Sequence, residues 1–356
     1  MSSNLILGKN TTVPFENTTF IGMEDSENFR FMEQNIKCQT TSNMVILDVD
    51  DHIYNNVKDN LDKKGYKVEQ LFAFDDTYNP FVCMKTEANI IDFADILAAA
   101  ISKKDKSKDK DMFWYCSTKR MLINYIMYHK EKHDISELSM KKLYDICKDK
   151  SILGFVDENL IGPITASIAA ALEKLLYPYR ELEGKGVSID VPVLLVEKKR
   201  ALFLKMDMRS KKSNLLYTIL LSQLFRQTMN MKHQEIVFFL KNSFELPVTY
   251  IPDAIPIILS MRKDSCVLLD MQYINDNAEF IESVTRNLVF DGSMNKETLN
   301  YIRSKAAHSV LEKKKCFFSF ISREKLLDES AIKSLRPEEE IIFHNETYKI
   351  DKKCEP

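Results

Sequence analysis

The spacing of hydrophobic residues changes twice along this chain. Up to about residue 86, short β-branched and apolar runs alternate with segments whose apolar residues recur every three or four positions. From 87 to about 179 only the helical spacing occurs, and strand-like runs return from about 200 onward. The pattern predicts strands at 18–21, 44–47, 67–74, 201–206, 235–240 and 266–269, a strong amphipathic helix at 214–229, and a last helix-and-strand unit at 330–350.

This alternation predicts an α/β fold, a mostly parallel sheet flanked by helices, with an all-α domain inserted into it. We assign residues 1–86 to the first part of the α/β core, 87–185 to the inserted all-α domain, and 186–356 to the second part of the core. A chain of 356 residues is long enough to bury a core of this kind.

Composition constrains the expected cellular location of the protein more than its function. A net charge of −2 gives no global electrostatic reason to bind nucleic acid. The seven cysteines include no C-x-x-C pair, so neither a disulfide framework nor a zinc site is predicted, and a reducing cytoplasm is the simplest location. No signal peptide or membrane-length apolar run is visible. We therefore expect a soluble, cytoplasmic chain.

A loop-like segment, FIGMEDSENFRF (20–31), follows the first predicted strand. Gly22 stands six residues before Asn28, which is the spacing between the first glycine and the lysine of the phosphate-binding motif G-x-x-x-x-G-K-[ST]. Glu27, however, replaces the second glycine, Asn28 the lysine and Phe29 the hydroxyl residue. The segment has the spacing of a nucleotide site without its chemistry.

Several further stretches fall into one order with this loop. They are MVILDVDDHIY (44–54), LDKKGYKVEQLFAFDDTYNPF (61–81), MFWYCSTKRMLINYIMY (112–128), KKRALFLKMD (198–207), NLLYTILLSQLF (214–225), EIVFFLKNS (235–243), IPDAIPIILSMR (251–262) and VLLDMQ (267–272). In this order the chain resembles the TraG-like coupling-protein ATPases of type IV secretion and bacterial conjugation. The likeness extends from about residue 6 to residue 350.

The resemblance implies a RecA-like P-loop NTPase core with the all-α domain inserted between the two nucleotide motifs. The stretch that begins at Asp48 takes the place of the family's D-P-K-G-E, and 65–68 and 79–81 match its G-Y-x-V and N-P-F elements. The family's amino-terminal membrane helices have no counterpart here, so we expect no direct membrane insertion and, at most, recruitment to the inner face of the membrane by a partner.

The loop departs from the family in charge. Asp25 stands where the family has glycine, while Ser26 is retained. With Glu24 and Glu27, three carboxylates lie where phosphate charges would be. Each close like-charge contact costs ~1 kcal/mol in water and ~4 kcal/mol at an effective dielectric constant of 20. Together with the lost lysine, this predicts that ATP and Mg²⁺ do not bind in the family manner.

The second nucleotide motif is altered as well. The family needs an apolar strand that ends in Asp-Glu, but here Lys241 and Asn242 follow the strand. A rival placement uses Asp253, although Ala254 would then lack the catalytic carboxylate. We prefer the first placement because 251–262 matches the family segment that follows its Asp-Glu.

Lys241 carries a hypothesis of its own. Its ammonium could pair with Asp25, Glu27 or Asp48 and replace the missing Mg²⁺ electrostatically; the alternative is that Lys241 simply points to solvent. Two further positions follow from the resemblance alone. The resemblance implies that Gln272 takes the place of the glutamine at the end of the family's next strand. It also implies that Arg262 lies in the family segment whose arginine approaches a neighbouring subunit.

His129 and His133 stand four residues apart in a helical segment, but lysine and glutamate surround them and no third ligand is indicated. We therefore predict no metal site.

Three functions remain open on the sequence. The first is a catalytically inactive coupling-protein relative that acts as a scaffold or partner-binding subunit. Its protein partners would be an active coupling ATPase, relaxase-like cargo or secretion components, and DNA is only weakly supported. The second is an active ATPase with a rearranged site built on Asp48 and Asp253. The third is a regulator or remnant of a mobile element that shares only the fold.

Overall fold

The computed structural model describes most of the chain. The described residues are 4–22, 28–49, 51–72, 78–101, 109–152, 162–184, 199–206, 214–230, 235–242, 251, 253–261, 265–274, 277–292, 295–308, 310–311, 329–345 and 347–353.

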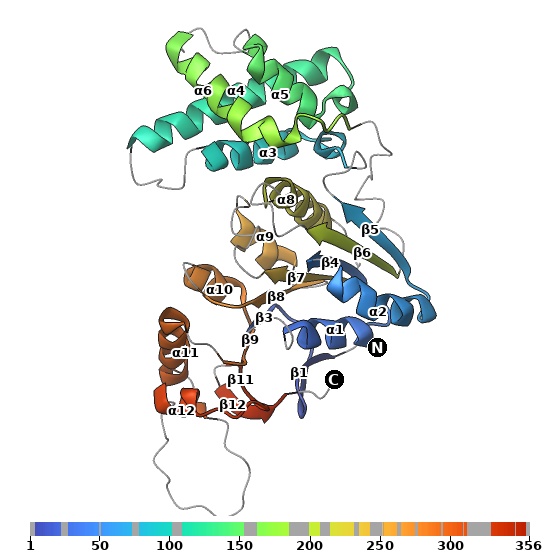
Figure 1. Ribbon diagram of the computed structural model, residues 1–356, viewed down its shortest axis with the longest axis vertical. Coiled ribbons are helices and arrows are strands. Elements are labelled where there is room, and N and C mark those ends of the chain that lie inside the picture. The colour runs from blue at the N-terminus through green and yellow to red at the C-terminus, as the bar shows by residue number, and fades with distance from the viewer. Residues whose placement is uncertain are drawn as a thin grey trace, which may run out of the picture.

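Within these ranges a ten-stranded sheet runs through the molecule (Figure 1). Its order is β10-β12-β11-β9-β3-β8-β7-β4-β6-β5, and the seven strands from β9 to β5 are parallel. The strands are β3 (Thr18–Ile21), β4 (Asn43–Val49), β5 (Lys67–Phe72), β6 (Arg200–Met206), β7 (Ile236–Asn242), β8 (Ser265–Met271), β9 (Asn287–Phe290), β10 (Val310–Leu311), β11 (Glu339–His344) and β12 (Thr347–Lys352).

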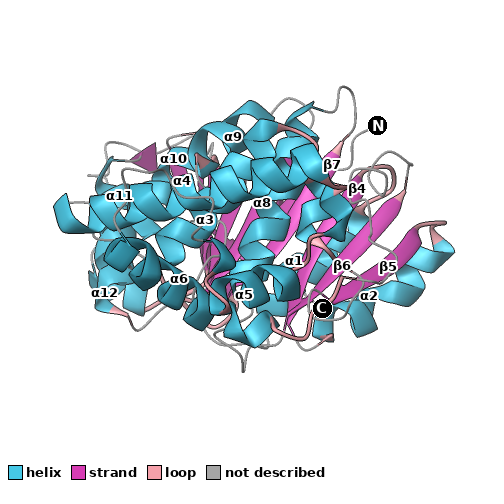
Figure 2. Ribbon diagram, turned by 90° about the horizontal axis from the view of Figure 1, so that it is seen from above, coloured by secondary structure: helices cyan, strands magenta, loops and turns pink. Residues whose placement is uncertain are grey.

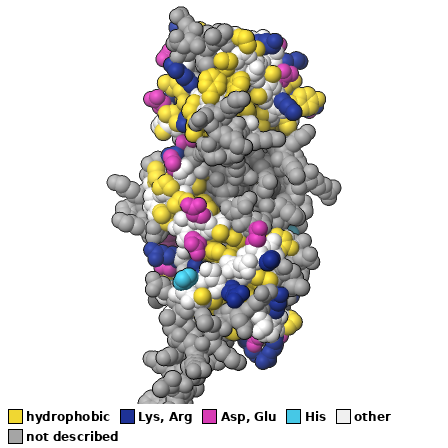
Figure 3. Space-filling view, turned by 90° about the vertical axis from the view of Figure 1, so that its left-hand side faces the viewer, with side chains coloured by type: hydrophobic (Ala, Val, Ile, Leu, Met, Phe, Trp, Pro, Cys, Tyr) yellow, Lys and Arg dark blue, Asp and Glu magenta, His cyan; other side chains and the backbone are white. Residues whose placement is uncertain are grey.

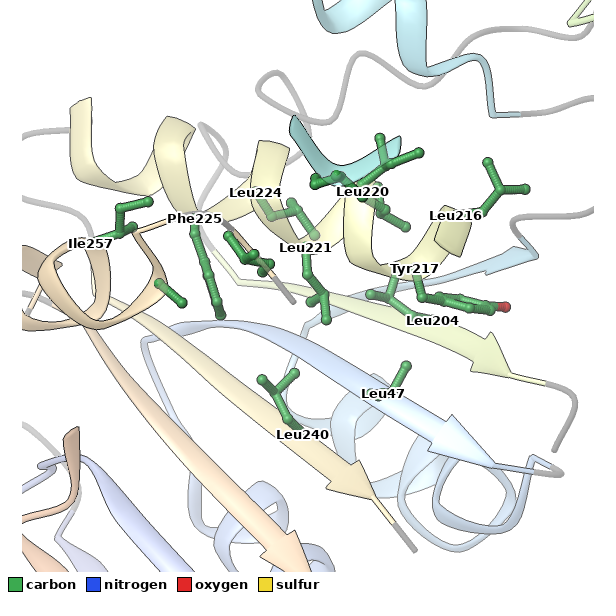
Figure 4. Close-up of a cluster of buried hydrophobic side chains, with 14 of the residues drawn as sticks. Leu47, Leu204, Leu216, Tyr217, Leu220, Leu221, Leu224, Phe225, Leu240 and Ile257 are labelled. Atoms are coloured by element: carbon green, nitrogen blue, oxygen red, sulfur yellow. The ribbon is translucent and has the colours of Figure 1, made fainter. Parts of the chain in front are cut away.

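Helices cover both faces of this sheet because successive strand residues point to opposite sides. One face packs on α1 (Asn28–Cys38) and α2 (His52–Lys63), with Phe239 of β7 in that core. The other face packs on α8 (Asn214–Asn230) and α9 (Ala254–Met261), with Leu240 in that core. Figure 4 shows this second core, in which leucines of α8 lie over Leu47 and Leu240 of the sheet. Further along it lie α10 (Ala278–Val284), α11 (Lys296–His308) and α12 (Glu329–Lys333).

The segment from 80 to 184 contains helices and no strand among its described residues. They are η1 (Pro80–Cys83), α3 (Glu87–Ile101), α4 (Asp109–Lys132), η2 (Ile135–Glu137), α5 (Met140–Lys148), α6 (Gly162–Leu176) and η4 (Tyr177–Tyr179). Seen from above, these helices lie over α8 and the sheet (Figure 2). The predicted α/β fold class with a helical insertion is thus confirmed, while the boundaries at 86 and 185 stay predictions. Among the described helices, none combines the length and the apolar composition that crossing a membrane demands.

Several elements differ from the sequence prediction. The strand expected at 67–74 ends at Phe72 as far as the chain is described, and the expected 330–350 unit contains a short helix and two strands, β11 and β12. The hairpin of β1 (Leu5–Gly8) and β2 (Thr11–Val13), together with β9, α10 and α11, was not predicted. β9 is as short as β3, but its sequence NLVF carries a single β-branched residue, whereas TTFI of β3 carries three.

The insertion is fastened to the core by polar contacts with α8. Arg226 of α8 forms a two-pronged ion pair with Asp92 of α3, in which Nη2 donates to Oδ1 at 2.6 Å. Beside it, the Tyr78 hydroxyl donates to Gln223 Oε1 at 2.8 Å, and Gln223 Nε2 donates to the carbonyl of Pro80 at 2.8 Å. Burial raises the pKa of Asp92 to about 6 despite the opposing effect of Arg226. The carboxylate therefore depends on its arginine.

We expect Arg226→Ala to destabilise the protein by about 3–5 kcal/mol, because it leaves a buried carboxylate without its counter-charge. Urea unfolding at pH 7.5 measures the loss. Arg336→Ala is the matched control, since Arg336 is 70% exposed and its ion pairs with Glu338 and Glu339 are 3.8 and 3.6 Å long. Equal stability of the two variants would contradict the importance of this contact.

A second fastening joins the first hairpin to the last. Glu340 of β11 is 4% exposed and lies opposite Asp351 of β12, which accepts from the Asn10 side chain at 2.9 Å. A Cβ at Gly8 would stand 2.7 Å from Glu340 Oε1, so a larger residue there would force the Glu340 side chain to move. Burial, and then the carboxylates of Asp291 and Asp351, raise the pKa of Glu340 to about 9.

This carboxyl should make stability depend on pH. The folded protein keeps the Glu340 proton up to about pH 9, whereas an unfolded chain releases it near 4.5, so its stabilising contribution is lost as pH rises between these values. Relative to the wild type, we expect Glu340→Gln to gain about 1.4 kcal/mol per pH unit in this window. Urea unfolding at pH 6, 7 and 8 tests this, with the exposed Glu338→Gln as control; a difference independent of pH would contradict it.

Candidate nucleotide site at the carboxyl ends of the strands

The carboxyl ends of β3, β8, β7 and β4 meet at one edge of the sheet, where ligands of open α/β sheets bind. Gly22 follows β3 and donates its N–H to the carbonyl of Met271 at 3.2 Å, and α1 begins at Asn28. The structure therefore places a strand before residues 23–27 and a helix after them, the two elements that flank a phosphate-binding loop. Asp25, Ser26 and Glu27 lie outside the described residues, and Asn28 and Phe29 are placed as the first residues of α1.

Charged residues occupy one level of neighbouring strands at this edge. Asp270 of β8 is in register with Lys241 of β7, and Asp48 of β4 is in register with Lys205 of β6. The pairing of Leu47 with Leu240 brings Asp48 and Lys241 to the same level. Asp270, Lys241 and Asp48 are only 1%, 4% and 1% exposed. The sheet thus carries buried charges of alternating sign from β8 to β4.

These side chains point toward α1 and α2. Phe239 and Leu268, two residues before Lys241 and Asp270, belong to the core beneath those helices. Since residues two apart share a face of a strand, Lys241 and Asp270 project to the side of the sheet that α1 and α2 cover. The two residues are therefore neighbours on one face of adjacent strands.

The burial of the Lys241 side chain excludes one of the two sequence hypotheses for this residue. The alternative that it points to solvent is wrong, because Lys241 is 4% exposed. Pairing with Asp25 or Glu27 falls outside the described residues and stays a hypothesis. The sequence reasoning missed Asp270, whose register makes it the acidic neighbour of Lys241. The signal was a carboxylate within the apolar strand VLLDM.

Asp48 serves the amino terminus of α2. Its Oδ1 accepts the N–H of Ile53 at 3.1 Å, and its Oδ2 accepts that of Tyr54 at 2.8 Å. Burial raises the pKa of Asp48, and these two hydrogen bonds oppose the rise. Asp51, the residue directly before α2, has a φ of 59° and forms an ion pair with Lys205. Asp48 therefore acts as an internal anion for the helix, satisfying N–H groups that a helix start leaves open.

No protein-family model and no curated protein matches this chain, so the likeness to known proteins comes from solved structures. Among solved structures, the plasmid coupling protein TrwB in complex with ADP and Mg²⁺ aligns with a TM-score of 0.71 at 12% identity, over 96% of this chain and 87% of that one. This chain has the coupling-protein fold. VirB4 of Thermoanaerobacter pseudethanolicus aligns with a TM-score of 0.61 at 12% identity, over 100% of this chain and 98% of that one. The resemblance indicated by the ordered motifs is thus confirmed at the level of the fold.

Within the coupling-protein fold, the rival residue Asp253 lies away from Lys241. Asp253 is exposed, has a φ of 56° and directly precedes α9, which packs on the α8 side of the sheet. Its charge also raises the pKa of Asp92 at the contact of α3 with α8. Asp253 and Asp48 therefore stand on opposite sides of the sheet and do not form one site.

The remaining predicted positions are only partly described. Gln272 follows β8 directly and is half-buried, next to the carbonyl of Met271 that Gly22 contacts. Asn242 ends β7 in register with Met271, whereas Arg262 lies outside the described residues. His129 and His133 stack at 4.9 Å, and no group of three metal-ligating side chains occurs in the described part of the chain.

Removing Lys241 tests whether the buried charges balance one another. We expect Lys241→Ala to destabilise the protein by about 3–5 kcal/mol, because it removes the cation beside the buried carboxylate of Asp270. Urea unfolding measures the loss. The double variant Lys241→Met/Asp270→Leu should recover part of it, since it removes charges of both signs. Lys205→Ala is the control, because Lys205 is 40% exposed and should cost no more than ~1 kcal/mol.

An unchanged melting temperature in Lys241→Ala would show that the ammonium is dispensable. A double variant as unstable as the sum of its single variants would show that Lys241 and Asp270 act independently.

Proposed function

We propose that this chain is a catalytically inactive relative of the conjugative coupling proteins, which acts as a scaffold or partner-binding subunit of a type IV secretion machinery. The observation that carries the proposal is the buried Lys241 on β7. It occupies the position at which the family resemblance places a carboxylate that supports Mg²⁺.

The electrostatics of this position disfavour the metal. Mg²⁺ binds through oxygen ligands, chiefly carboxylates, phosphates and water. A buried ammonium at the same place repels the dication, and one pair of unit charges 4 Å apart already costs ~4 kcal/mol at an effective dielectric constant of 20. Asp270 stands in register with Lys241 on the next strand, so a metal near Asp270 would also lie close to a lysine.

The rival function, an active ATPase with a rearranged site, is less well supported. It needs Asp48 and Asp253 to act together, but both oxygens of Asp48 accept hydrogen bonds from α2. Asp253 belongs to the opposite side of the sheet, next to α9. A regulator or remnant of a mobile element would share the same fold, and association with secretion components separates it from the proposed subunit.

Protein contact is the role we assign to the helical insertion. TrwB is a plasmid coupling protein, and by analogy this chain would meet an active coupling ATPase, relaxase-like cargo or other secretion components in the cytoplasm. Large apolar side chains of the insertion support this, since Met112, Phe113, Tyr128 and Tyr177 are 41%, 44%, 45% and 50% exposed. A partner could also recruit the chain to the inner face of the membrane.

Thermal unfolding with and without Mg-ATP, or its non-hydrolysable analogue, tests the inactive assignment. A ligand at a hundred times its dissociation constant stabilises a protein by ~2.7 kcal/mol, which shifts the melting temperature measurably. We expect no Mg²⁺-dependent shift at millimolar nucleotide, because Lys241 opposes Mg²⁺ and the acidic residues of 24–27 oppose phosphate. TrwB, which binds ADP with Mg²⁺, is the positive control. A clear shift together with ATP turnover would overturn the proposal.

A further inference from the structure

A polar groove opens at the opposite edge of the sheet, where β3 and β9 begin. Three segments far apart in the sequence line it: the end of α10 with Arg286, one side of α11, and the turn between β11 and β12. Its volume is about 670 Å³, within the range of about 300–1,000 Å³ typical of small-molecule sites. Two smaller cavities elsewhere have volumes of about 10 and 30 Å³. Figure 3 shows the face that bears α10 and α11, on which Lys and Arg side chains are interspersed with acidic ones.

Among the described residues, the groove is lined by more basic than acidic side chains. Arg286 and Lys305 carry positive charges, His308 and His344 add imidazole groups, and Glu282 is the acid among these described lining residues. The hydroxyl group of Ser304 adds a polar group to the lining, whereas the hydroxyls of Thr285 and Thr347 already contact Thr19 and the carbonyl of His344. This combination suits an anion with several acceptor oxygens.

The backbone holds Arg286 firmly at the rim. Its N–H donates to the carbonyl of Asn17 at 2.8 Å, and the next residue, Asn287, starts β9 in register with His344. The imidazole of His344 contacts the side chains of Asn287 and Asn345 through its two nitrogens. The turn of β11 and β12 is thus fixed beside Arg286, so the guanidinium has a rigid base from which to reach a ligand.

The opposite wall is shaped by an aromatic ring of α11. The Lys305 ammonium lies 5.9 Å from the centre of the Tyr301 ring, which keeps this cation on the groove side of the helix. The Tyr301 hydroxyl is buried and has no hydrogen-bond partner among the described residues. Burial, with a smaller effect of Glu282, raises the pKa of Tyr301, so the phenol stays protonated and can donate.

We propose that this groove binds a phosphorylated ligand of about mononucleotide size. Arg286 is the principal phosphate-binding group, because its planar guanidinium can donate two parallel hydrogen bonds to one phosphate. Lys305 and His308 flank the phosphate, and Glu282 and Tyr301 offer an acceptor and a donor to the rest of the ligand. The groove lies at the edge of the sheet remote from Lys241, so this binding is independent of the lost nucleotide site.

Calorimetric titration of the full chain with AMP, adenosine and inorganic phosphate tests the proposal. We expect AMP to bind at least tenfold more tightly than adenosine, which lacks the phosphate. Arg286→Ala should weaken AMP binding at least tenfold. Arg303→Ala is the matched control, because Arg303 is an exposed residue of α11 outside the lining, and it should change binding less than twofold. Equal melting temperatures of the two variants would establish that both fold.

Two sources of phosphate are separated by a further comparison. Tetrathymidylate with a 5′-phosphate binding as tightly as AMP would identify the end of a nucleic-acid strand as an acceptable ligand, whereas preference for AMP would identify a free nucleotide. No binding of any phosphorylated probe at millimolar concentration, equal affinity for AMP and adenosine, or undiminished binding by Arg286→Ala would each overturn the proposal.

The same variants keep this result apart from the proposed inactivity. ATP-dependent stabilisation that survives in Arg286→Ala belongs to the site near Lys241 and counts against the inactive assignment alone. AMP binding unchanged in Lys241→Ala supports the separate groove.

Discussion

The parallel register of β7 and β8 places Lys241 and Asp270 next to each other inside the protein. The charge distribution at the carboxyl ends of the strands depends on this register. A buried ammonium is tolerated only where an opposite charge lies close by. Here β8 lies between β3 and β7, so a buried lysine and a buried aspartate stand next to each other beside the strand that precedes residues 23–27. Under the proposed function, these side chains take over the charge balance that a bound nucleotide and metal would supply.

The same logic of internal replacement extends to β4. Asp48 supplies the amino terminus of α2 with an anion from within the chain, which is the role that a bound phosphate plays at other helix starts. In both cases a side chain of the protein carries a charge that a bound ligand would otherwise carry. The architecture is retained because packing of two large cores holds it, one on each face of the sheet, and these cores do not depend on the chemistry at its edge.

Much of this could be predicted from the sequence because it is written in local patterns. The change from strand-like to helical spacing after residue 87 marks the insertion, and the spacing around Gly22 marks the loop. Asp270 and the groove at Arg286 could not be found in this way, since they depend on strand register and on segments more than 50 residues apart. The exposed or buried state of Lys241 likewise follows from what covers its strand. β9 escaped because it carries a single β-branched residue, and the last helix-and-strand unit was predicted without its division into β11 and β12.

The position of β3 has a consequence for biosynthesis. This strand leaves the ribosome early, yet both of its neighbours, β8 and β9, come from the last third of the chain. The side-chain contacts that fix it, from Asn17 to Val267 and from Thr18 to Asn287, span 250 and 269 residues. Such contacts close late and slow folding. The helical insertion is formed mainly by contacts close in sequence, so it can fold before β8 and β9 are synthesised. The nascent chain can therefore contain the folded helical insertion while the sheet is still incomplete.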